Sequence, residues 1–260
     1  MSWVVDHHLP KVKRTRMCVG AILFWFFLML VTPKLSHSPE HHSFSDMRNF
    51  LGVPNTLNVI TNFPFLIVGV LGFVLCLEGD FFNISLRGEI WGWTIFYTGI
   101  AAVAFGSAYY HLKPDNSRVT WDTLPMMIAY SSVLSSLIVE RAGKRVGLTC
   151  LIGLLIVAFI STAYERNLND LRMCMMFQLI PCIAIPCVTL LYPPKYTHSR
   201  YWLLAAGVYL LGQFEVVADR KIFKVTRYVI SGHSLEHLCV AMVPGLLTIM
   251  LMLRSTSSPR

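Results

Sequence analysis

The chain has 260 residues, of which 55% are hydrophobic and only 14% are charged, and its mean hydropathy is +0.56. Soluble domains carry about 25% charged residues, so this composition excludes an ordinary soluble fold. Long apolar runs recur along the whole length, which predicts an all-α polytopic membrane protein and not a β-barrel, whose spans are shorter and alternating. The net charge of +8 comes from cations at the ends of the runs and in loops. That pattern is typical of membrane-flanking charge and not of nucleic-acid binding.

Residues 1–33 combine a basic segment with the first apolar run, Met17–Thr32. The run is preceded by four cations, at Lys11, Lys13, Arg14 and Arg16. This arrangement is typical of a signal anchor or of a cleaved signal peptide. No small-x-small cleavage site follows the run, which favours an extra N-terminal transmembrane helix in addition to the core, without excluding cleavage.

Residues 34–54 are polar and predict a lumenal loop. Its histidines have no regular spacing and are interpreted as solvated: His37, His41 and His42. The seven cysteines of the chain lie in or beside apolar runs without any CxxC spacing. The sequence therefore indicates neither a disulfide framework nor a thiolate zinc site.

Residues 55–254 contain seven further apolar runs and predict a seven-transmembrane-helix core, followed by a tail at 255–260. Each run is long enough to cross a hydrocarbon layer about 30 Å thick. Because the connections are short, consecutive helices are expected to be antiparallel. The predicted helices are Thr56–Leu77, Ile90–Leu112, Val119–Val139, Val146–Ala163, Leu171–Leu191, Tyr201–Ala218 and Gly232–Leu253.

Polar residues inside these runs are informative, because an ionisable group in hydrocarbon is costly and is usually kept for function. Ser107 and His111 lie one turn apart at the end of the second predicted helix. Asp122 lies at the start of the third, where it is either a helix cap or a functional carboxylate. His233 and His237 open the seventh helix, and their spacing puts both imidazoles on one face, where they can share a metal ion such as Zn²⁺.

Two further polar groups lie near the ends of helices. Asn58, Thr61 and Asn62 share a face of the first helix, a pattern typical of hydrogen bonds between helices. Glu215 and Asp219 lie at the end of the sixth helix. If consecutive helices alternate in direction, both groups and all three histidines lie at one membrane face. This convergence predicts a metal site with three histidine ligands.

Ser-x-x-x-His closing one helix, an Asp eleven residues later and His-x-x-x-His opening the last helix together resemble the alkaline ceramidase family. Here the pattern is formed by Ser107, His111, Asp122, His233 and His237. The resemblance covers residues 46 to about 253 and leaves out the first helix. The family belongs to a superfamily of seven-helix membrane hydrolases that also includes the progestin and adiponectin receptors and lipases that remodel GPI lipids.

The resemblance implies an intramembrane zinc amidase that hydrolyses the N-acyl bond of a ceramide to a sphingoid base and a free fatty acid. It implies that His111, His233 and His237 bind Zn²⁺. Asp122 would contact the water at the metal and exchange a proton with it, and Ser107 would line the site and stabilise charge on the amide oxygen. Hydrogen bonds that support the ligands would come from Asn58, Asn62, Glu215 and Asp219.

The sequence leaves several alternatives open. Glu215 and Asp219 could pair with Arg220 and Lys221 instead of supporting the ligands. The zinc could be purely structural, as in a receptor-like seven-helix protein, or the substrate could be an ester lipid. Animal ceramidases bind calcium through an acidic cluster before the first core helix; this chain has only Asp46 there, so a Ca²⁺ site is doubtful. No obligate protein partner is indicated, and the expected partners are ceramide or a related lipid and the membrane itself.

The orientation follows from the basic cluster before the first helix, since cations beside the first span usually stay in the cytosol. The zinc face is then expected to look into the lumen or the exterior, in the endoplasmic reticulum or Golgi or at the plasma membrane.

Overall fold

The computed structural model describes residues 20, 23–38 and 42–256. Within these residues the regular secondary structure is helical, with two isolated β-bridges and no strands, so the all-α prediction is confirmed. Among the described residues, six helical stretches are long and apolar enough to cross a membrane, and the bent pair α9–α10 makes a seventh if it is counted as one span. The chain is therefore an integral membrane protein with a core of six or seven spans.

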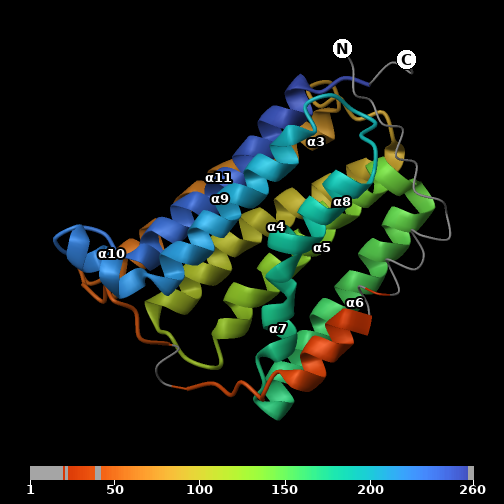
Figure 1. The fold of residues 1–260 in the computed structure, drawn as a ribbon. Helices are drawn as coiled ribbons and strands as arrows, with labels where there is room; N and C mark the ends of the chain where they lie inside the picture. The colour runs from red at the N-terminus through yellow and green to blue at the C-terminus, as the bar shows by residue number, and fades with distance from the viewer. Residues whose placement is uncertain (1–19, 21–22, 39–41, 257–260) are drawn as a thin grey trace.

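The predicted N-terminal transmembrane helix falls largely outside the described residues, which omit 1–19 and 21–22. Its described part, residues 23–31, is helical and is drawn in red in Figure 1. Arg172 caps the C-terminal end of this helix: its Nη1 donates hydrogen bonds to the carbonyl oxygens of Met29 and Thr32, at 2.8 and 2.7 Å. Retention of the helix as a membrane anchor stays a prediction.

All seven predicted core runs are helical and follow one another up and down the bundle (Figure 1). The elements are α2 (Thr56–Ile60), α3 (Phe63–Glu78), α4 (Arg87–Leu112), α5 (Val119–Ala142), α6 (Lys144–Leu168), α7 (Arg172–Phe177), η2 (Ile180–Ala184), α8 (Ile185–Leu191), α9 (Arg200–Val217), α10 (Asp219–Val225) and α11 (Gly232–Leu253).

Two runs predicted as single helices are interrupted at prolines. The first run breaks between α2 and α3, because Pro64 lacks an N–H group and starts a new helix. The fifth run contains the π-helical turn η2 between α7 and α8, with Pro181 inside the turn and Pro186 at the start of α8. Each proline removes one backbone donor, so the hydrogen-bond ladder shifts locally.

The sixth run was predicted to end at Ala218, but the chain bends there by 83° and continues as α10. No proline lies at this bend. Contacts with other segments hold it instead: the carboxylate of Asp219 accepts hydrogen bonds from the backbone N–H groups of Ser45 and His233, at 3.0 and 2.9 Å. Because these partners are distant in sequence, no local pattern predicts the bend.

The alternation of direction gives the bundle two distinct ends (Figure 1). The α4–α5 connection, the start of α2, the bend into α10 and the start of α11 lie at one end. The α3–α4, α5–α6 and α8–α9 connections lie at the other, with the end of α11. The predicted convergence of polar residues at one end is therefore confirmed.

A buried ionic cluster lies at the end of the bundle where α11 finishes, opposite the start of α11. Arg254, just after α11, pairs with Glu89 of α4 at 2.5 Å and lies 3.8 Å from Glu140 of α5. Its guanidinium also stacks on Tyr196, whose hydroxyl donates to Glu89 at 2.9 Å. All four side chains are buried, so the cluster joins α4, α5 and the α8–α9 connection to the end of α11.

Candidate metal centre

Three histidines meet at the end of the bundle where α4 finishes and α11 begins. Nε2 of His111 lies 3.3 Å from Nε2 of His233, and the ring centroids of the three imidazoles are 4.7 to 5.0 Å apart. One nitrogen from each of His111, His233 and His237 lies within 4.8 Å of the others. Among the described residues, this is the group of His, Cys, Asp and Glu side chains that could hold a metal ion.

The spacing of these nitrogens fits a metal ion. Two imidazoles bound to tetrahedral Zn²⁺ at about 2.0–2.1 Å have their ligand nitrogens about 3.3–3.4 Å apart, and the observed separation between His111 and His233 is 3.3 Å. His111 and His237 are buried. Three converging imidazoles, two of them buried, are a donor set that suits Zn²⁺.

The tautomer of His237 is fixed by Thr61, which lies in the break between α2 and α3. The Thr61 hydroxyl donates to the carbonyl of Leu57 at 2.7 Å, so its oxygen accepts from Nδ1–H of His237 at 2.9 Å. A proton on Nδ1 leaves the lone pair of Nε2 free to bind a metal. Hydrogen bonds of this kind orient ligand histidines and strengthen their binding.

The start of α11 is built so that His233 and His237 face α4. Ser231 caps the helix by accepting from the N–H of Ser234 at 3.1 Å. Gly232 lies against the α9–α10 bend, where an added Cβ would come within 2.1 Å of the carbonyl oxygen of Glu215. Any side chain at this position would push α11 and its two histidines away from the bend.

Asp122 and Ser107 face each other beside the histidines. Ser107 is buried one turn before His111, and its hydroxyl lies near the carboxylate of Asp122 at the start of α5. Gly106 makes this approach possible, because a Cβ there would lie 1.8 Å from the carbonyl oxygen of Trp121. The close contact between α4 and α5 therefore sets the position of Asp122.

These groups open onto a cavity of about 310 Å³. Ser107, Asp122, His233 and His237 form part of its polar wall. The apolar wall comes from α3, α4, α5, α7 and α9, with Phe65, Val103, Met126, Met127, Leu171, Met175, Phe177 and Val216. A second, apolar cavity of about 30 Å³ shares Met126 and Tyr130 with the first and lies among α4, α5, α9 and α11. A polar end and an apolar body suit a lipid with a reactive head and a hydrocarbon chain.

The sequence of the chain matches the family model described as Ceramidase over residues 52–258. The chain belongs to the ceramidase family. Membership indicates a hydrolase of amide bonds with a lipid substrate such as ceramide, and it supports the resemblance seen in the histidine, serine and aspartate pattern. No match was found among the curated proteins.

The four residues predicted to support the histidine ligands all lie near the candidate metal centre, but they make different contacts. Asn58 accepts from the hydroxyl of Ser234 at 2.6 Å, and so ties α2 to the first turn of α11. Asn62 donates to the backbone of Asn58 and lies 3.4 Å from Nδ1 of His237. Asp219 binds the backbone N–H of His233 and not its ring.

Glu215 is a neighbour of the thiol of Cys239, and its Oε2 is buried without a hydrogen-bond partner among the described residues. Within the same part of the chain, neither Glu215 nor Asp219 forms an ion pair with Arg220 or Lys221. The alternative pairing considered from the sequence is therefore not found in the described structure.

Two residues of the centre were missed by the sequence analysis. Glu236 lines the cavity, and its Oε2 lies 3.7 Å from Nε2 of His237. An ionisable residue inside an apolar run, three positions after His233, was a signal that could have found it. Phe44 covers the histidines, with ring centroids 4.6 Å from His111 and 4.7 Å from His233. No local pattern singles out Phe44, because it belongs to a polar loop.

The interpretation of the loop histidines as solvated is wrong for His37 and His42, while His41 lies outside the described residues. Nε2 of His37 lies 3.1 Å from the buried carboxylate of Glu165. His42 contacts the hydroxyl of Tyr110 at 2.9 Å. The polar loop packs against the end of the bundle, so His37 and His42 contact residues that are distant in the sequence. Sequence spacing within the loop does not reveal such contacts.

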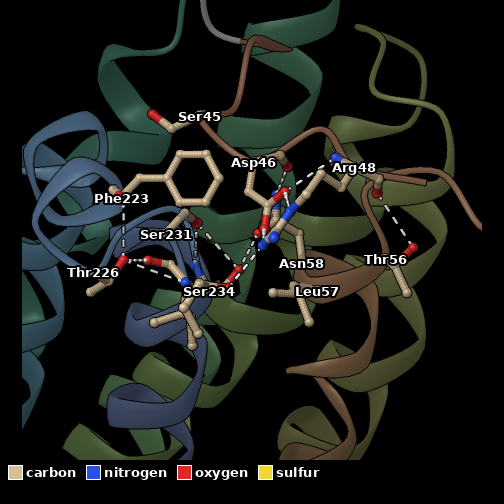
Figure 2. A network of polar contacts seen from close by, with 12 residues as sticks. Ser45, Asp46, Arg48, Thr56, Leu57, Asn58, Phe223, Thr226, Ser231 and Ser234 are labelled. Atoms are coloured by element: carbon tan, nitrogen blue, oxygen red, sulfur yellow. Dashed lines mark hydrogen bonds and ion pairs between the residues drawn. The ribbon is translucent and has the colours of Figure 1, made fainter. Parts of the chain in front are cut away.

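Asp46, the lone acidic residue considered for calcium, is buried and already neutralised. Both of its carboxylate oxygens accept from the guanidinium of Arg48, at 2.8 and 2.6 Å. Arg48 also donates to the carbonyl of Val229 at 2.8 Å, which fastens this loop to the chain just before α11 (Figure 2).

Proposed function

We propose that the protein is a zinc-dependent amidase of the membrane that cleaves the N-acyl bond of ceramides and releases a sphingoid base and a free fatty acid. The observation that carries the proposal is a three-histidine group that opens, next to a carboxylate and a hydroxyl, onto a cavity with apolar walls. Membership of the ceramidase family supports the substrate class.

His111, His233 and His237 would hold the zinc ion. When bound, the ion would supply a Lewis acid that polarises the amide carbonyl and makes water more acidic. The chain's own part is to orient the imidazoles, which it does through the Thr61 hydroxyl at His237 and the rigid start of α11.

Asp122 is the proposed general base. Its carboxylate lines the cavity beside the histidines, where it would orient a water molecule and accept a proton from it. The same group would then pass the proton to the nitrogen of the leaving sphingoid base. Asp122 therefore returns to its starting state at the end of each cycle.

Ser107 is the proposed donor to the amide oxygen. Its hydroxyl lies near Asp122 at the cavity wall, one turn before His111. With substrate bound, the hydroxyl would turn toward the carbonyl oxygen and stabilise the negative charge that develops there. The acyl chain would lie along the apolar wall of the cavity.

A purely structural zinc is the competing function. A closed structural site is surrounded by protein ligands and leaves no position open to water. Here two of the three histidines, His233 and His237, line a cavity that also presents Asp122 and Ser107, which a structural site does not need. This arrangement favours the enzyme over the receptor-like protein.

The direct test is hydrolysis by the purified, zinc-loaded protein. A ceramide and a matched ester lipid of equal chain length are incubated with it in detergent, and fatty acid and sphingoid base are measured by mass spectrometry. We expect equimolar fatty acid and sphingoid base from the ceramide. Release from the ester alone would move the assignment to an ester hydrolase. Absence of release from both, in protein with a full complement of zinc, would favour the receptor-like protein.

A further inference from the structure

A short basic helix crosses the end of the bundle next to the candidate metal centre. α10 is bent by 83° from α9, so it lies across the bundle axis at the level where a membrane-spanning α9 leaves the hydrocarbon. Apolar side chains flank it and are exposed, with Val217 at 88%, Val225 at 83% and Val229 at 66%. Helices that combine exposed apolar residues with cations in this position lie in the membrane interface.

The segment carries cations that have no ion-pair partner within the described part of the chain. Four exposed cations, here called the basic rim, lie on α10 and in the turn that follows it: Arg220, Lys221, Lys224 and Arg227. Among the described residues, none of the four takes part in an ion pair. The nearest carboxylate in sequence, Asp219, is engaged with the backbone of Ser45 and His233.

A pocket lies beneath the basic rim. Its volume is about 440 Å³, and it is bounded by α10 and by the loop that passes over the metal centre. Two cations of the rim, Arg220 and Lys224, line it together with hydroxyl and aromatic side chains: Ser43, Phe44, Ser45, Phe223 and Tyr228. Figure 2 shows Ser45 and Phe223 on this side of the polar network. Two cations beside hydroxyl groups suit the oxygens of a phosphate group.

We propose that this pocket binds the phosphate headgroup of an anionic phospholipid from the surrounding leaflet. The uncompensated charge of the basic rim is complementary to such a headgroup. The exposed valines on either side favour a lipid over a soluble anion, because they give the acyl chains apolar surface to cover. Phe44 belongs both to the pocket and to the cover of the histidines, so the bound headgroup lies next to the metal centre.

The proposal is tested with full-length protein in a neutral detergent, titrated with pyrene-labelled phosphatidylglycerol or phosphatidylcholine. Energy transfer from tryptophan to pyrene reports binding. We expect the double variant Arg220→Gln, Lys224→Gln to bind phosphatidylglycerol at least tenfold more weakly than the unmodified chain, with little change for phosphatidylcholine. The charge-preserving variant Arg220→Lys, Lys224→Arg should keep most of the affinity.

The matched control is Lys144→Gln with Arg145→Gln, which removes the same charge from exposed positions at the opposite end of the bundle. An equal loss of affinity in this control would show a general charge effect and overturn the site. Equal affinity of the unmodified chain for the two lipids would overturn it as well. Displacement of the labelled lipid by inorganic phosphate at millimolar concentration would assign the pocket to a soluble anion and contradict the lipid. Binding does not depend on hydrolysis, so failure here leaves the proposed amidase untouched.

Discussion

The three histidines can bind one metal ion only if each imidazole turns its unprotonated nitrogen toward the other two. At His237 this is settled by a chain of two hydrogen bonds, from Nδ1 to the Thr61 hydroxyl and from that hydroxyl to the backbone of α2. His111 and His233 approach each other through Nε2. Because two neutral imidazoles at this distance cannot both carry a proton on the facing nitrogen, the contact is either one N–H···N hydrogen bond or a pair of ligands to a shared metal ion.

The first prediction concerns the metal. We expect about one zinc per chain, and each of His111→Ala, His233→Ala and His237→Ala should lose it, because each removes one of the converging nitrogens. The measurement is zinc content by plasma mass spectrometry after gel filtration. His198→Ala is the matched control, since this histidine lies in the α8–α9 connection at the other end. Full zinc occupancy in the His237→Ala protein would exclude this ligand set.

The second prediction concerns Thr61. Replacing it by valine keeps the shape but removes the acceptor for Nδ1–H of His237, so zinc affinity should fall by about 10–100-fold in competition with a chelator. Thr98→Val is the control, because its hydroxyl makes the same bond to its own helix but faces no histidine. Equal zinc affinities in the two variants would mean that Thr61 does not affect metal binding and acts only in the structure of the break between α2 and α3.

The third prediction concerns Asp122. Asp122→Asn should keep its zinc and its fold while the rate of ceramide hydrolysis falls by roughly 10²–10⁴, the usual range for a lost general base. Asp115→Asn removes a carboxylate from the same α4–α5 connection, where Asp115 caps a turn through Ser117, and should leave the rate nearly unchanged. Near-normal turnover in Asp122→Asn would show that this carboxylate is not the general base and that it only caps α5.

Sequence reasoning succeeded at single residues where the signal is local and failed where it is not. The spacing of His233 and His237 depends only on the period of one helix, so their shared face could be predicted. The partner of His237 could not, because Thr61 is 176 residues away and reaches it only at the break before Pro64. The sequence left Asp219 with two possible partners, a ligand histidine ring or the cations Arg220 and Lys221. The bend after α9 instead brings its carboxylate to the backbone of His233.

At the scale of whole helices, the close packing of α4 on α5 determines where the base lies relative to the metal. Gly106 is the point of closest approach, since an added Cβ would fall 1.8 Å from the carbonyl oxygen of Trp121. Two of the three histidines, His233 and His237, lie on α11 and take no part in this contact. A shift of α5 away from α4 therefore moves Asp122 more than it moves the histidines.

The fourth prediction uses this difference. Gly106→Ala should displace the start of α5 and with it Asp122, so hydrolysis should fall by about 10²-fold, the effect expected for a misplacement of about 1 Å. Zinc content should be retained. Gly207→Ala is the control on α9, where an added Cβ meets nothing within 4 Å. Unchanged hydrolysis in Gly106→Ala would show that α5 tolerates the shift and that Asp122 is not held by this contact.

The apolar runs predicted most of the helical bounds, because length and hydropathy are summed over many residues. The third predicted helix, for example, ended at Val139 and α5 ends at Ala142. The internal breaks were harder to see. Pro64, Pro181 and Pro186 are visible in the sequence, yet a proline inside an apolar run only weakens the ladder. Whether the run then breaks, bulges or merely bends depends on the neighbouring helices.

At the scale of the whole molecule, the two ends of the bundle must face opposite sides of the membrane. The one N-x-Ser/Thr acceptor in the sequence, at Asn83, lies in the α3–α4 connection, at the end away from the histidines. Its side chain also donates to the carbonyl of Met252 at 2.9 Å. The basic N-terminal cluster predicts that this end is cytosolic.

The fifth prediction follows for orientation. The unmodified chain should carry no glycan, whereas Ser36→Asn creates an acceptor in the loop at the histidine end and should be glycosylated if that end is lumenal. An endoglycosidase-sensitive mass shift on a gel is the measurement. A shift in the unmodified chain that disappears in Asn83→Gln would invert the orientation and open the metal centre to the cytosol.

The buried cluster around Arg254 has a consequence for how the protein is made. Glu89 and Glu140 enter the membrane early during synthesis, but the arginine that pairs with Glu89 follows 165 residues later. Glu140 has the adjacent Arg141 as an ion-pair partner at 3.1 Å, but until then Glu89 lies in a growing bundle without its cation, a costly state within hydrocarbon. The final packing around Glu89 on α4 must therefore wait for α11, so the helix that supplies Ser107 and His111 reaches its working arrangement only after α11 has been made.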